Sequence, residues 1–66
     1  MKKENKEFEK FVSYFNSQAE IAREFDLTPA MISQIRSGDR KVSVDFAYRI
    51  VTRFPQLDFL KLVKPQ

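Results

Sequence analysis

The sequence predicts a small all-α domain, a bundle of four or five short helices. Apolar residues recur at intervals of three and four along most of the chain, which is the spacing of one helix face. Ser or Thr precedes three of these stripes, and the single Gly and the three Pro fall where helices should begin or end. A length of 66 residues suits one domain, so we expect residues 1–66 to form a single unit.

The composition excludes most catalytic and metal-binding chemistries. The chain has no Cys and no His, which removes disulfides, thiolate nucleophiles, imidazole bases and the usual zinc ligands. A hydrolase built on carboxylates would need residues such as Glu20 and Glu24 or Asp26, but these are spaced as surface and capping residues of one short helix. We therefore expect neither an enzyme nor a metal or cofactor site.

The charge distribution favours an anionic binding partner, and we expect the protein itself to be cytoplasmic. Residues 1–10 are highly charged without an apolar core, and no run approaches the roughly 18 apolar residues of a membrane span. Within this segment Glu7 and Glu9 alternate with lysines and are expected to be solvated. The net charge is +3, and residues 28–41 carry Arg36, Arg40 and Lys41 against a single acidic residue.

The first two helices can be located from apolar stripes and a capping signal. Four residues form the stripe of a first helix over about 6–15: Phe8, Phe11, Val12 and Phe15. The segment 17–20 fits a capping box, in which the Ser17 hydroxyl accepts from the Glu20 amide and the Glu20 carboxylate accepts from the Ser17 amide. The second helix begins there, with three residues facing inward: Ile21, Ala22 and Phe25.

The third and fourth helices have clearer limits. Thr28 suits an N-cap, and Pro29 suits the first helical position, where its missing donor would be unpaired in any case. Gly38 can adopt the left-handed conformation that ends the third helix after Ser37. Three residues of this helix face inward: Met31, Ile32 and Ile35. Ser43 is expected to cap a fourth helix that ends at Pro55, with an inward stripe of Ala47, Ile50, Val51 and Phe54.

Two features after residue 40 leave an alternative to the all-α fold open. Leucines and neighbouring apolar residues in 56–63 have helical spacing, so we prefer a fifth helix, although an extended segment fits as well. Val42, Val44 and Phe46 alternate with polar residues at the period of a strand, which would give an α+β fold with a C-terminal hairpin. Three aromatic residues lie off the core stripes and, if exposed, suggest a dimer interface: Phe46, Tyr48 and Phe59.

Residues 18–37 meet the requirements of a helix-turn-helix unit. Two short helices joined by a tight turn cross closely only if a small residue occupies the fifth position of the first helix, and counting from Gln18 this residue is Ala22. The turn needs a residue with positive φ, which Asp26 tolerates. Three apolar residues would lock the second helix onto the first: Leu27, Ile32 and Ile35.

The stretch from Tyr14 to Val42 resembles the Cro family of phage repressors and related small bacterial regulators. The resemblance implies a lambda-repressor-like or Cro-like fold and a repressor that binds an operator in double-stranded DNA, usually as a homodimer. It also implies that helix 28–37 enters the major groove while the preceding helix crosses the backbone. Gln18 resembles the family residue that clamps a phosphate and orients the recognition helix.

The remaining site residues follow from this geometry. Six positions are exposed when the apolar residues of the third helix face inward: Thr28, Pro29, Ala30, Ser33, Gln34 and Ser37. Gln34 is the best base reader, because its amide can bond bidentately to adenine N6 and N7. Three cations are expected to contact phosphates: Arg36, Arg40 and Lys41. The alternative is a protein-binding module with the same helices, such as an antitoxin or anti-repressor, which a modest net charge would suit.

Overall fold

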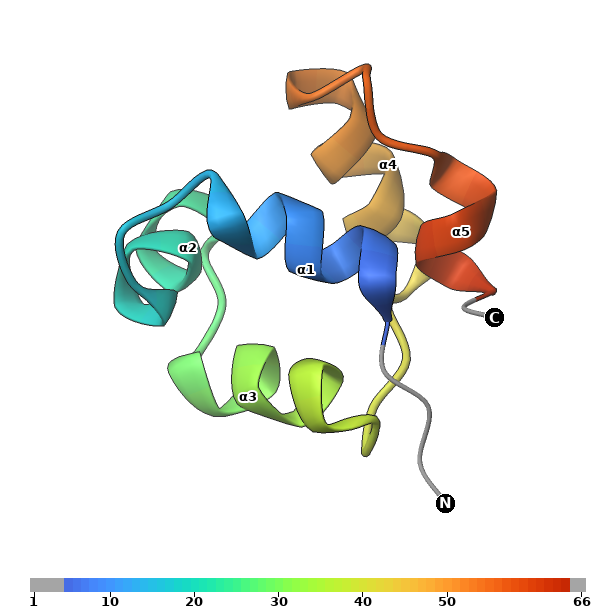
Figure 1. Cartoon of the computed structure of the whole chain (residues 1–66). Coiled ribbons are helices and arrows are strands. Elements are labelled where there is room, and N and C mark those ends of the chain that lie inside the picture. Colours follow the sequence, from blue (N-terminus) through green and yellow to red (C-terminus); the bar gives the residue numbers. More distant parts are fainter. Residues whose placement is uncertain (1–4, 65–66) are drawn as a thin grey trace.

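The computed structural model describes residues 5–64, and this part of the chain contains five α-helices joined by short loops (Figure 1). Their bounds are α1 Lys6–Ser13, α2 Gln18–Phe25, α3 Pro29–Ser37, α4 Val44–Arg53 and α5 Phe59–Val63. No residue from 5 to 64 is in a strand, so the all-α prediction is confirmed and the α+β alternative with a C-terminal hairpin is wrong. None of these helices is both long and apolar enough to cross a membrane.

The segment with strand-like alternation is the start of α4. Ser43 caps this helix, since its Oγ accepts a hydrogen bond from the Phe46 amide at 3.1 Å. Val42 is a buried loop residue, Val44 is exposed on the first turn, and Phe46 is only 5 % exposed. The prediction that Phe46 lies off the core stripe is therefore wrong, because Phe46 lies four residues before Ile50, on the same face of the helix.

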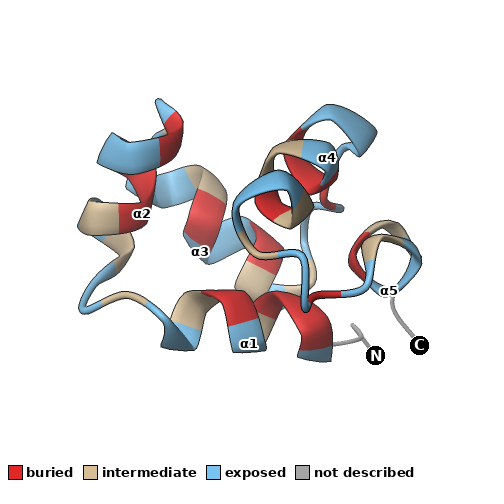
Figure 2. Cartoon of the chain, turned by 90° about the horizontal axis from the view of Figure 1, so that it is seen from above, coloured by how far each residue is buried: buried red, intermediate tan, exposed pale blue. Residues whose placement is uncertain are grey.

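The buried parts of the helices face the middle of the bundle (Figure 2), and phenylalanines from three of them meet in the core. Phe11 is fully buried, and its ring centroid lies 5.2 Å from that of Phe25 and 6.1 Å from that of Phe46. Both pairs meet edge to face, which suits the opposite partial charges of ring faces and ring edges. Since the rings come from three helices, this cluster holds α1, α2 and α4 together.

The capping box predicted at the start of α2 forms with one difference in detail. The Ser17 Oγ accepts from the Glu20 amide at 3.1 Å, as the capping box predicts. The Glu20 carboxylate accepts instead from the Asn16 amide at 3.3 Å, one residue before the expected donor. The first helix ends at Ser13 rather than near Phe15, and the fourth ends at Arg53, just before Pro55.

The turn between α2 and α3 depends on Asp26. This residue caps α2 with φ 57° and ψ 48°, the left-handed conformation that was expected of it. The Leu27 amide then donates to the Ala22 carbonyl at 2.7 Å, and the small Ala22 is buried. Thr28 begins α3 by accepting from the Met31 amide at 3.2 Å. Only three residues therefore separate the two helices.

Asp26→Ala is expected to lower the free energy of unfolding by about 1 kcal/mol, because alanine lacks the short polar side chain whose local hydrogen bonding lets aspartate tolerate the left-handed conformation. Asp26→Gly is the matched control, since glycine has no Cβ and adopts this conformation without a steric cost. Urea denaturation followed by circular dichroism measures both. Equal unfolding midpoints for the two variants would contradict the assigned role of the turn.

Two buried polar side chains fasten α5 to α1. Asn5 caps α1 by accepting from the Phe8 amide at 3.0 Å, and its Nδ2 donates to the Leu62 carbonyl at 2.8 Å. The buried Glu7 accepts from the Asp58 amide at 2.7 Å, where α5 begins. Because buried polar groups are costly unless they are hydrogen-bonded, these contacts fix the short α5 in place. The expectation that Glu7 is solvated is wrong; residues 1–4 of the same charged segment lie outside the described part.

Candidate nucleic-acid interface

The outward face of α3 carries all the residues predicted to face DNA on this helix. Ile32 and Ile35 are buried, and Met31 packs partly buried against the core. The residues left outside are exposed: Thr28, Pro29, Ala30, Ser33, Gln34 and Ser37. In Figure 1 this helix lies along the lower edge of the molecule. The prediction of which side of α3 is exposed is therefore confirmed.

Arg40 is hydrogen-bonded to Gln34 near the C-terminal end of α3. The Arg40 Nε donates to the Gln34 Oε1 at 3.0 Å, and the Arg40 backbone amide donates to the Gln34 carbonyl at 3.2 Å. Gly38 makes this reversal feasible, because it caps the helix with φ 88° and lets the chain turn back. The side-chain bond uses one lone pair of the glutamine oxygen and neither of its amide hydrogens. A cation is thus held beside the predicted base reader.

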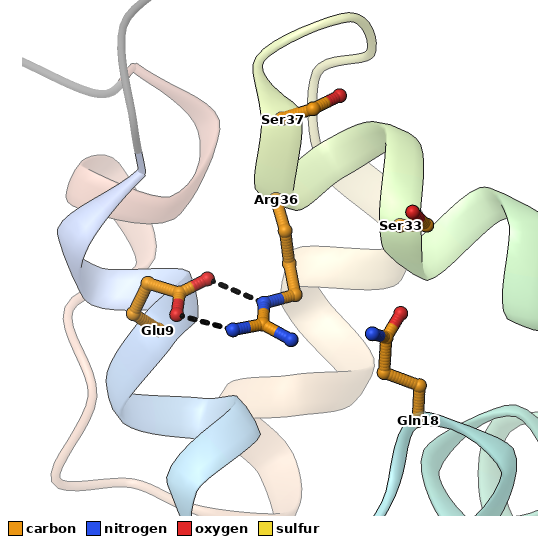
Figure 3. Close-up of a pocket in the computed structure, with 5 residues that line it drawn as sticks. All are labelled: Glu9, Gln18, Ser33, Arg36 and Ser37. Carbon is orange, nitrogen blue, oxygen red and sulfur yellow. Dashed lines mark hydrogen bonds and ion pairs between the residues drawn. The ribbon is translucent and has the colours of Figure 1, made fainter.

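Arg36 is engaged by α1. Its Nε and Nη2 donate to the two carboxylate oxygens of Glu9 at 2.9 and 3.1 Å, a bidentate pair (Figure 3). The hydrogen bonds that Arg36 donates to Glu9 raise the pKa of Arg36 above its ordinary value, so the guanidinium stays charged at any working pH. Much of its positive charge is balanced by the carboxylate. Glu9 was expected to be solvated; its side chain is 39 % exposed, and it is also paired with Arg36.

The Arg36–Glu9 pair borders a shallow polar hollow of about 350 Å³ between α1, α2 and α3. Gln18, Ser33 and Ser37 complete its lining. In Figure 3 the Gln18 amide points toward the guanidinium of Arg36, on the side of the nitrogen that Glu9 leaves unbonded. The hollow therefore places the Gln18 amide and the Ser33 hydroxyl near the guanidinium edge that Glu9 leaves unbonded, and these neutral groups can donate to one phosphate oxygen beside Arg36.

The segment after α3 adds further charged groups. Arg40 and Lys41 are both exposed there. The Ser37 Oγ lies 2.8 Å from the Asp39 Oδ2 and 3.1 Å from the Gln34 carbonyl oxygen. A hydroxyl has a single hydrogen, so it donates to one of these acceptors at a time. Asp39 is thereby drawn toward the end of α3, near the cations that precede α4.

The structure brings nine of the ten predicted site residues to α3 and its two flanks, and Gln18 joins them from α2. Sequence reasoning missed Glu9, because an acidic residue that pairs 27 positions away leaves no local pattern. Within residues 5–64 no three acidic side chains gather in a way that could hold a metal ion. Comparisons with protein-family models, with curated proteins and with solved structures found no match to this chain. The resemblance to the Cro family stays a prediction from residues 14–42.

Proposed function

We propose that the protein is a DNA-binding transcriptional repressor of the Cro type, acting in the cytoplasm of a bacterial cell or of a phage host. In this proposal α2 and α3 form the helix-turn-helix, and α3 enters the major groove of an operator. The observation that carries it is the outward face of α3. This face carries small and mostly polar residues, residues 28–37 contain no acidic side chain, and Arg40 and Lys41 follow after Gly38 and Asp39. The major groove, roughly 12 Å wide, admits a helix of this kind.

The exposed residues divide into base contacts and backbone contacts. Gln34 is the base reader, while Ser33 can bond to several bases and the Ala30 methyl can contact a thymine methyl. Thr28, Pro29 and Ser37 border the groove at the two ends of the helix. Four residues are proposed to hold phosphates, Gln18 and Arg36 from the polar hollow and Arg40 and Lys41 from beyond α3. Because three of these four are cationic, affinity should depend strongly on salt.

Exposed apolar residues on α4 favour an additional protein contact. Val44 and Tyr48 lie one helical turn apart, and 66 % and 65 % of their surfaces are exposed. We assign this contact to a second copy of the chain, bound to the neighbouring half-site about 34 to 36 Å away along the duplex. The same surface also suits the second candidate function, a protein-binding module such as an antitoxin or anti-repressor.

Titration of the protein against mixed-sequence duplex DNA at several salt concentrations tests the proposal. A protein that neutralises several phosphates loses affinity with a log-log slope of about −0.9 for each phosphate. We expect a slope between roughly −3 and −5 if three to five phosphates are contacted. Weak binding with a flat salt response would contradict DNA binding and favour the protein-binding module. Selection from a random duplex pool then yields the operator for the tests below.

A further inference from the structure

A second hollow lies beside the C-terminal end of α3 and reaches the C-terminal end of α5. Its volume is about 420 Å³, and its described lining combines apolar and cationic residues with the polar Asn5. Ile35, Gly38 and Val63 supply the apolar part, and Arg40, Lys41 and Lys64 supply three positive charges. None of the residues from 5 to 64 that line it is acidic.

We propose that this hollow seats one deoxyribose-phosphate unit of the DNA backbone, at the edge of the groove that α3 enters. The inference rests on the proposed DNA-binding function and adds α5 to the interface. A backbone unit combines an apolar sugar face with a phosphate carrying one negative charge. The sugar would lie mainly against Val63, since Ile35 is only 2 % exposed at the base of the hollow, and Gly38 has no side chain to obstruct it; the phosphate would lie among the three cations.

The hollow is held in a fixed relation to α3. Arg40, which lines the hollow, is hydrogen-bonded to Gln34 through both its backbone and its side chain, so this part of the lining is tied to the predicted base reader. Lys64 caps α5, and the Asn5 side chain holds the last turn of that helix through the Leu62 carbonyl. A phosphate bound here would therefore set the depth and register of α3 in the groove, which is the usual role of backbone contacts.

Continuity with α3 selects the DNA backbone as the occupant. A small inorganic anion would engage the cations but would leave the apolar part of the lining in water. An acidic protein segment could fill both the apolar and the cationic part of the lining, but its binding would not require the hollow to be tied to Gln34. A DNA strand that runs past the end of α3 meets the two parts of the lining together.

Lys64→Ala tests the inference, and Lys61→Ala is its matched control. Both lysines are exposed on or next to α5, but only Lys64 lines the hollow. Binding to the selected duplex is followed by fluorescence anisotropy between low and moderate salt. We expect Lys64→Ala to make the log-log salt slope shallower by about 1 and to weaken binding to all duplexes alike. Lys61→Ala should keep the natural slope, and Lys41→Ala should behave as Lys64→Ala does.

Methylphosphonate substitution locates the phosphate concerned. Each backbone phosphate of the selected duplex is replaced in turn by the uncharged methylphosphonate. We expect one position per half-site at which the methylphosphonate weakens binding of the natural protein. At the same position it should not weaken binding of the Lys64→Ala variant any further. If the natural protein binds with a steep salt slope but Lys64→Ala and Lys61→Ala behave alike, this inference is overturned and the proposed function stands. If the natural protein does not bind duplex DNA, both are overturned.

Discussion

Phe11→Ala is expected to lower the free energy of unfolding by about 3 to 5 kcal/mol, enough to unfold much of this small domain at room temperature. Phe11 is fully buried, and its ring lies within 6.1 Å, centroid to centroid, of five other phenylalanine rings: Phe8, Phe15, Phe25, Phe46 and Phe54. These neighbours belong to α1, α2, α4 and the segments that follow α1 and α4. A cavity at this point would loosen several helix contacts together.

Tyr48→Ala is the control for this prediction. It removes an aromatic ring that is 65 % exposed on α4, and substitutions of that kind change stability by only about 0.5 kcal/mol. Urea denaturation monitored by circular dichroism measures both variants. Equal unfolding midpoints for Phe11→Ala and Tyr48→Ala would show that the aromatic cluster does not hold the bundle together.

Gln34→Ala is expected to weaken binding to the selected operator by about 1 to 3 kcal/mol, with little change on random duplex DNA. The reason is that its amide reads a base edge, whereas random DNA is bound through phosphates. Gln56→Ala is the matched control, because Gln56 is exposed between α4 and α5, far along the chain from α3. An equal loss on operator and random DNA would remove Gln34 from the base-reading role.

The bond between Arg40 and Gln34 sharpens this test. Arg40→Lys keeps the positive charge but replaces the Nε donor that holds the Gln34 oxygen. We expect this variant to retain the natural salt slope and to lose part of the preference for the operator. In the double variant with Gln34→Ala, the loss of preference should be less than the sum of the two single losses. Strict additivity would show that Arg40 contacts phosphate alone.

Local sequence signals predicted most of the fold. The caps at Ser17, Thr28 and Ser43 and the left-handed Asp26 are each set by residues only a few positions apart, so they could be read directly. The exposed face of α3 followed from the spacing of its isoleucines. Phe46 could also have been placed in the core, because it lies four positions before Ile50, but the alternation that began at Val42 obscured this.

Contacts between distant polar residues could not be predicted. Asn5 bonds to Leu62, Glu7 to Asp58 and Glu9 to Arg36, across separations of 57, 51 and 27 positions. Each of these residues looked like an ordinary charged or polar surface residue in the sequence, since only the packing of α1 on α5 and α3 buries or pairs it. The bond from Arg40 to Gln34 likewise depends on the return of the chain after Gly38.

Chemical-shift mapping by NMR tests the central claim most directly, namely that the outward side of α3 contacts DNA. Isotope-labelled protein is titrated with the selected duplex, and shifts of backbone and side-chain amides are recorded. We expect the largest changes at Thr28, Ser33, Gln34 and Ser37 and in the segment 39–41, with small changes in the core. Changes confined to the α4 surface around Val44 and Tyr48, with α3 unaffected, would contradict the claim.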